Sequence, residues 1–224
     1  MRSILFVALV AGVVACGDSS PAPASREPLK TLELPAPDTD GDRSLEAILA
    51  SRRSSREFSE KKLSRATIGQ LAWATQGVTS PEGGRTSPSA GSLYPLELYV
   101  ATVDGIFRYV PGDHALELLD DRNLRAEIHA ACKSQQVIRD AAAVFVLSAI
   151  YARTNEVYKG GRAPVFVHVE AGHAAQNFLL QAAALGLAAC PIGGFDSKKL
   201  QQIMGMGKGE YALYALPVGH PQEP

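Results

Sequence analysis

A run of basic and hydroxyl side chains occupies residues 52–58. It reads Arg-Arg-Ser-Ser-Arg-Glu-Phe and follows a short amphipathic segment that contains Leu45, Ile48 and Leu49. Guanidinium forks match the oxygens of a phosphate, and hydroxyls add short donors, so this run is suited to holding a phosphorylated ligand. The alternative is that these cations only complement the dipole at a helix C-terminus and remain in water.

Three further segments are built from small, polar and turn-forming residues. They are the loop at 85–97, the stretch at 170–187, and residues 191–195 together with 217–221 near the end of the chain. Each of them alone is explained equally well by a surface loop, a polar helix position or a turn. Only their joint order and spacing carries functional information.

The elements that must position these segments are helices and strands in mixed order. Periodicity predicts helices at about 45–51, 65–76, 121–132, 166–185 and after Asp196, and strands at about 96–101, 106–110, 115–119, 142–150, 187–190 and 211–218. The run at 142–150 is continuously apolar, which is typical of a strand buried on both faces. No βαβ rhythm is present, so we expect an α+β domain with a mainly antiparallel sheet.

Length and composition limit the choice of protein class. The 224 residues are 46% hydrophobic and carry a net charge of −1. A chain of this size can bury one substantial core, so one folded domain is expected, over residues 43–221. The balanced charge gives no indication of nucleic-acid binding. Cys132 and Cys190 allow one disulfide but no framework, and they lack metal-ligand spacing.

The N-terminus reads as an export signal. Residues 1–15 combine Arg2 with an apolar run that is too short to span a bilayer. Val13-Val14-Ala15-Cys16 resembles a bacterial lipobox, which implies acylation of Cys16, and the alternative is an ordinary signal peptide. Residues 16–42 are rich in proline and predict an extended tether. We therefore expect an exported protein, lipid-anchored to the bacterial cell envelope on its periplasmic face.

In their order and spacing, the four segments resemble the nitroreductase superfamily, and within it the SagB-type or thiazole/oxazole dehydrogenase branch. The resemblance covers roughly residues 32–221. It implies a homodimer that holds one FMN per subunit at the interface. The long helix rich in small residues is the candidate for the dimer core, because such a helix can approach another backbone closely.

The resemblance also implies roles for particular residues. The basic run would bind the FMN phosphate and the ribityl or ring oxygens, through Arg52, Arg53, Ser54 and Arg56. The 85–97 loop would lie against the isoalloxazine, through Pro88, Ser89 and Gly91, because proline and glycine let backbone approach a flat ring. Backbone N–H groups of Gly193 and Gly194 would lie near flavin N5 and O4, where donors stabilise the anionic reduced flavin.

Two positions depart from the family pattern. In many relatives an arginine stands where His220 is and helps to neutralise the phosphate; a histidine does so only when protonated, which predicts weaker, pH-dependent phosphate binding. Azoline-oxidising members carry an adjacent Lys-Tyr pair before the long helix. Here the register gives Val157-Tyr158, followed by Lys159. Tyr158 and Lys159 are the candidate catalytic residues, and Val157 argues against azoline oxidation because valine cannot act as a base.

The sequence thus predicts an FMN-dependent oxidoreductase that transfers hydride through flavin N5 to or from a small organic substrate. A tyrosine is a poor base at neutral pH but a usable proton donor, which favours reduction of a quinone or nitroaromatic. Two alternatives stay open. One is a membrane-tethered lipoprotein that binds flavin or a partner without turnover, favoured by the lack of nicotinamide reductant outside the cytoplasm. The other, less favoured, is a peptide azoline dehydrogenase.

Overall fold

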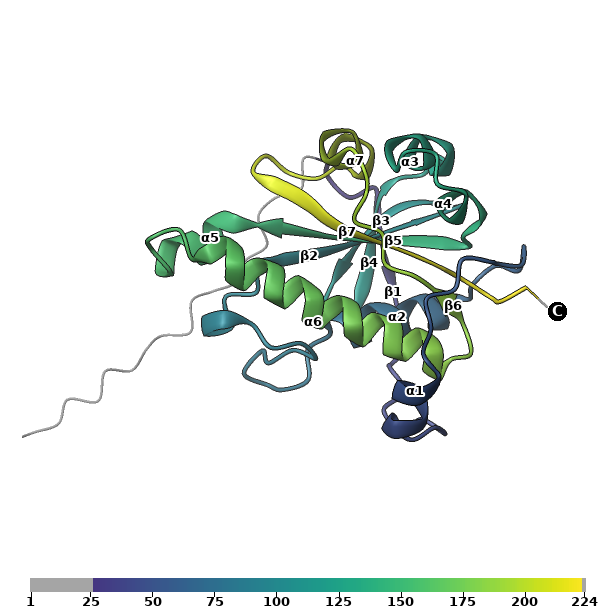
Figure 1. Cartoon of the computed structure of the whole chain (residues 1–224). Coiled ribbons are helices and arrows are strands. Elements are labelled where there is room, and N and C mark those ends of the chain that lie inside the picture. The colour runs from purple at the N-terminus through teal and green to yellow at the C-terminus, as the bar shows by residue number, and fades with distance from the viewer. Residues whose placement is uncertain (1–25, 223–224) are drawn as a thin grey trace, which may run out of the picture.

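The computed structural model describes residues 26–222, which form one seven-stranded sheet with helices on both faces (Figure 1). The strands are β1 Lys30–Glu33, β2 Leu96–Thr102, β3 Gly105–Val110, β4 Ala115–Asp120, β5 Ala143–Ile150, β6 Ala188–Ala189 and β7 Glu210–Gly219. They lie in the order β1-β4-β3-β2-β5-β7-β6, and all six neighbouring pairs are antiparallel. The expected α+β class with an antiparallel sheet is confirmed.

The helices are α1 Leu45–Ser51, α2 Arg65–Gln76, α3 Arg125–Ala131, α4 Gln136–Asp140, α5 Tyr151–Val157, α6 Ala163–Ala184 and α7 Ser197–Met204. Three of the helices, α1, α2 and α7, begin at a short polar side chain that caps them. Ser44, Ser64 and Asp196 each accept a hydrogen bond from a backbone N–H three residues later, which satisfies one orphan donor of the first turn. The helix predicted at 121–132 is shorter than expected, and the sequence pattern did not predict α4 or α5.

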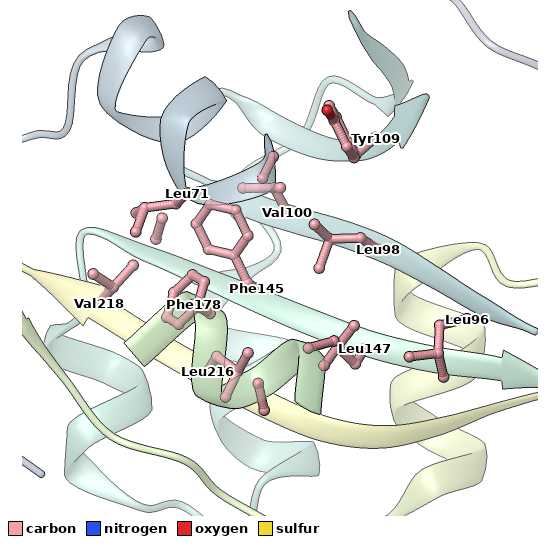
Figure 2. Packing of buried hydrophobic residues seen from close by; sticks show 14 of the residues in the cluster. Leu71, Leu96, Leu98, Val100, Tyr109, Phe145, Leu147, Phe178, Leu216 and Val218 are labelled. Carbon is pink, nitrogen blue, oxygen red and sulfur yellow. The ribbon is translucent and has the colours of Figure 1, made fainter. Parts of the chain in front are cut away.

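The sheet separates two apolar layers. Leu96, Leu98 and Val100 of β2 face α2 and α6, whereas Tyr99 and Ala101 face α3, α4 and α7. The period-2 alternation of a strand therefore supplies both layers, and every residue of β2 is buried. Figure 2 shows the first layer, in which side chains of α6 and α2 meet those of β2, β5 and β7.

The N-terminal boundary of the domain lies earlier than the sequence indicated. Residues 30–33, which fall inside the predicted tether at 16–42, pair with β4, and Leu34 is buried in the core. Edge pairing with β4 overrides the proline-rich composition around it. Arg26 adds an ion pair to Asp120 at 2.6 Å. Hydrogen bonds from Arg122, with a smaller effect of Arg26, lower the pKa of that carboxyl to about 2.

The expected signal segment at 1–15 and the acylation site Cys16 lie outside the described residues, so both stay predictions. Within residues 26–222, no helix combines the length and the apolar character needed to cross a bilayer.

Candidate functional site

The basic run lies beside a cavity of about 290 Å³ at the C-terminal end of α1. The helix stops at Arg52, whose backbone turns to an extended conformation at ψ 123°. The cavity is lined by Arg43, Ser51, Arg52, Arg53, Ser55, Ala183, Gly186, Leu187, Ala188 and Pro221. Within the described chain, Arg52, Arg53 and Arg56 form no ion pair. An anion such as a phosphate fits cations that lack a carboxylate partner.

Only two of the four residues predicted in the basic run to bind the phosphate line the cavity. Arg52 and Arg53 line the cavity, whereas Ser54 and Arg56 are exposed and do not. Within the basic run, the serine that lines the cavity is Ser55, which was not predicted from the sequence. Its backbone N–H donates to the Ala189 carbonyl of β6 at 3.0 Å, which fixes the run against the sheet.

His220 is brought to the end of the basic run by the chain after β7. Its carbonyl accepts the N–H of Ser59 at 2.9 Å, and Pro221 pairs with Phe58 and lines the cavity. Burial, with a contribution from the charge of Lys61, lowers the pKa of His220 below its usual value. The imidazole is therefore mostly neutral at pH 7.

The loop that contains Pro88, Ser89 and Gly91 has an unusual backbone. Gly91, Ser92 and Tyr94 have φ values of 62°, 53° and 43°, in the left-handed region that non-glycine residues rarely adopt. Two hydrogen bonds hold the backbone of Tyr94: its N–H donates to Ser89 Oγ at 2.9 Å, and its carbonyl accepts from Arg153 of α5 at 2.9 Å. Backbone strain of this kind is typical of functional loops.

A buried carboxyl lies against this loop. Glu170 of α6 is only 3% exposed and lies close to the Ser89 hydroxyl. Its Oε1 has no hydrogen-bond partner within residues 26–222. Burial raises the pKa of Glu170 to about 7, although Ser89, Arg85 and Arg153 favour the ionised form. Glu170 begins the 170–187 segment, and no role was predicted for it from the sequence.

The two candidate catalytic residues have different surroundings. The Tyr158 ring packs on Phe166 of α6, with centroids 4.7 Å apart, and a Cβ placed on Gly91 would lie 3.2 Å from the Tyr158 hydroxyl. Lys159 is exposed, and its ammonium donates to the carbonyl of Asn155 at 2.9 Å. Val157 is 57% exposed. The structure thus brings Tyr158 to the strained loop and gives Lys159 a surface contact.

The predicted diglycine segment follows β6. A Cβ added to Gly193 would meet no atom within 4 Å, so its backbone borders open space. The carbonyl of Gly194 accepts a hydrogen bond at 2.9 Å from the Gln135 side chain, which also donates to the Cys132 carbonyl at 2.9 Å. Gln135 therefore fixes this segment, and nothing in the local sequence indicated that role.

Comparison with known proteins gives consistent results. Residues 49–220 match the model of the nitroreductase family. A protein of Methanocaldococcus jannaschii named as a nitroreductase is 36% identical over 195 residues, which cover 84% of this chain and 96% of that protein. A Ralstonia eutropha JMP134 crystal structure named as a nitroreductase has a TM-score of 0.78 and 28% identity, over 89% of this chain and 99% of its own. The NADPH:FMN oxidoreductase of Vibrio harveyi, solved with NAD⁺, shares the fold at a TM-score of 0.60 and 18% identity, over 80% of this chain and 69% of its own.

Proposed function

Because the chain belongs to the nitroreductase family, we propose that it is an FMN-dependent oxidoreductase that transfers hydride to or from a small organic substrate. The observation that carries the proposal is the cavity at the end of α1. Arg52 and Arg53 line it without a carboxylate partner among residues 26–222, and a phosphate dianion would supply the missing negative charge. A protein with the same fold is an NADPH:FMN oxidoreductase, so the fold is compatible with FMN.

The residues present fit FMN in three places. Arg52, Arg53 and Ser55 would hold the phosphate, with Ser54 and Arg56 close by in the same run. Pro88, Ser89 and Gly91 would lie against the ring system. Gly193 and Gly194 would present backbone donors to it, and the open space beside Gly193 leaves room for a flat group. When bound, FMN supplies two-electron hydride chemistry that amino-acid side chains cannot provide.

The chain's own contribution to the reaction would be proton transfer and exact placement of the loop. The Tyr158 hydroxyl, beside Gly91, is the proposed proton donor to the reduced substrate. Lys159, on the exposed surface, is the weaker candidate. Glu170 would help to position the loop through Ser89, which lies close to its carboxyl and whose hydroxyl accepts the N–H of Tyr94. Val157 supplies no base, so the proposed substrate is an electron-poor acceptor rather than a peptide azoline.

A second copy of the chain is the proposed partner. Large apolar side chains are exposed on α1, on α6 and just beyond α6, and these are Leu45, Leu49, Val165, Val169 and Leu185. An apolar surface of this kind favours burial against another protein surface. The proposed homodimer would cover it, with α6 contributing its small residues to the contact.

The proposal is tested first by flavin binding. The purified domain is expected to be yellow, and Arg52→Ala is expected to weaken FMN binding by about 1.5–3 kcal/mol, the worth of a hydrogen bond to a charged group. Quenching of flavin fluorescence measures the Kd, and Arg65→Ala, an exposed arginine at the start of α2, is the control. A colourless wild-type protein that fails to take up micromolar FMN would contradict the proposal. Anaerobic reduction followed by mixing with a quinone distinguishes an enzyme from a binding protein.

His220→Arg is expected to tighten FMN binding by about 0.5–1 kcal/mol at pH 8 and by less at pH 5.5. The reason is that His220 is uncharged at pH 8 and gains a proton only as the pH falls, whereas arginine carries its charge at both values. Titrations with FMN at the two pH values measure the effect. Riboflavin, which lacks the phosphate, serves as the control ligand, and an equal gain for riboflavin would show that His220 does not act on the phosphate.

A further inference from the structure

A separate cavity of about 380 Å³ lies between the 78–85 segment, Tyr94 and the β3–β4 hairpin. No residue proposed above to bind FMN lines it. Its charged lining residues are Arg85, Glu97, Arg108, Glu117 and Arg153. Cavities of a few hundred Å³ that combine apolar walls with a few polar groups are typical of small-molecule sites.

The charges in this cavity do not balance. Arg108 donates twice to one oxygen of Glu117, at 2.9 and 2.6 Å, and Arg153 donates to Glu97 at 2.6 Å. Arg85 forms no ion pair with any described residue. Among the residues that line the cavity, three cations therefore face two carboxylates, which leaves one positive charge without a paired carboxylate; Glu170, outside the lining, acts on Arg85 only through space.

Arg85 is held in place by neutral groups. Its Nη1 donates to the Gln76 side-chain oxygen at 2.8 Å, and its guanidinium lies 4.5 Å from the centre of the Tyr94 ring. Burial lowers the pKa of Arg85, with a partly compensating effect of Glu97, as expected for a desolvated cation without a direct anionic partner. A fixed planar guanidinium with unused N–H donors is preorganised to hold a carboxylate in a two-pronged hydrogen bond.

The remaining wall of the cavity is apolar. Pro81, Tyr109 and Pro111 contribute to it, and they come from the loop after α2, from β3 and from the hairpin turn. Such a wall suits a flat hydrocarbon body next to the charged end. We propose that this cavity binds a small aromatic carboxylate, with its carboxylate on Arg85 and its ring against the apolar wall. The proposal does not depend on FMN binding.

Calorimetric titration of the mature protein with benzoate, with and without FMN, tests this proposal. Saturable binding is expected, whereas benzamide, which has nearly the same shape but no charge, should bind at least about 10-fold more weakly. Arg85→Met should weaken benzoate binding by about 10-fold or more, and Arg85→Lys should retain part of it. Equal affinities for benzoate and benzamide, or binding that does not saturate, would overturn the proposal.

Two further variants locate the site. Arg53→Met removes a cation from the α1 cavity and should leave benzoate affinity unchanged; loss of binding in this variant instead of in Arg85→Met would place the anion there and refute the proposal. Pro81→Glu adds a negative charge at an exposed position on the cavity wall and should weaken binding several-fold. This substitution tests the proposed site even if Arg85→Met fails to fold. An unchanged affinity for benzoate would count against the proposed site.

Discussion

Replacing Glu170 by glutamine is expected to remove a pH dependence of stability worth about 3 kcal/mol. Burial raises the folded-state pKa of Glu170 to about 7, from 4.5 for an unperturbed carboxyl. Because the folded state binds this proton more tightly than the unfolded state, the contribution of Glu170 to stability falls as pH rises from 4.5 to 7. Below this window the carboxyl is neutral in both states, and above it the buried charge carries its full penalty.

Urea unfolding of the wild type and of Glu170→Gln at pH 5 and pH 8 measures this difference. The free energy of unfolding of the variant should rise relative to that of the wild type as pH increases. The reason is that glutamine keeps the shape of the side chain and an acceptor near Ser89 but never ionises. Glu156→Gln, at an exposed carboxylate of α5, is the control and should show little change. Parallel pH profiles for Glu170→Gln and the wild type would show that a cation compensates the buried carboxylate.

The same carboxyl explains how a strained loop is held. Ser92 and Tyr94 adopt positive φ values, which cost about 1–3 kcal/mol each for non-glycine residues unless the surroundings fix them. The Ser89 hydroxyl accepts the N–H of Tyr94 and lies close to the Glu170 carboxyl, so a side chain of α6 packs against the residue that holds the turn. The position of a loop proposed to contact FMN therefore depends on a residue behind it.

The sequence predicted those elements that depend on interactions between residues close together in the chain. Ser44 and Ser64 cap their helices because short polar side chains satisfy orphan N–H groups wherever they stand. The apolar run at 142–150 forms β5, an interior strand of the sheet that is buried throughout. The strand at 30–33 was missed because its cause is not local: it exists through pairing with β4, whereas its own composition indicates a tether.

The candidate site could be predicted in part for the same reason. The basic run is continuous in sequence, so its arginines were found, although which serine lines the cavity depends on the extended backbone after α1. Gln135 reaches the diglycine segment, and Tyr158 reaches Gly91, only through the tertiary fold. A family resemblance can suggest such pairs, but periodicity and spacing cannot.

Tyr158→Phe is expected to slow reduction of a quinone or nitroaromatic acceptor by about 100-fold or more, because a positioned general acid contributes that much or more to a proton-transfer step. FMN affinity should be unchanged, since the phenylalanine ring can keep the packing on Phe166 and only the hydroxyl beside Gly91 is lost. Stopped-flow reoxidation of the reduced protein measures the rate, and fluorescence titration measures the Kd.

Lys159→Ala is the matched control, because Lys159 is exposed and bonded to the carbonyl of Asn155. It should change the acceptor reaction by less than about 3-fold, within the range of a surface substitution. Equal rates for Tyr158→Phe and the wild type would show that the proton comes from solvent or from another group. Efficient oxidation of an azoline peptide that Lys159→Ala abolishes would show instead that the lysine serves as the base, and that Val157 does not exclude this chemistry.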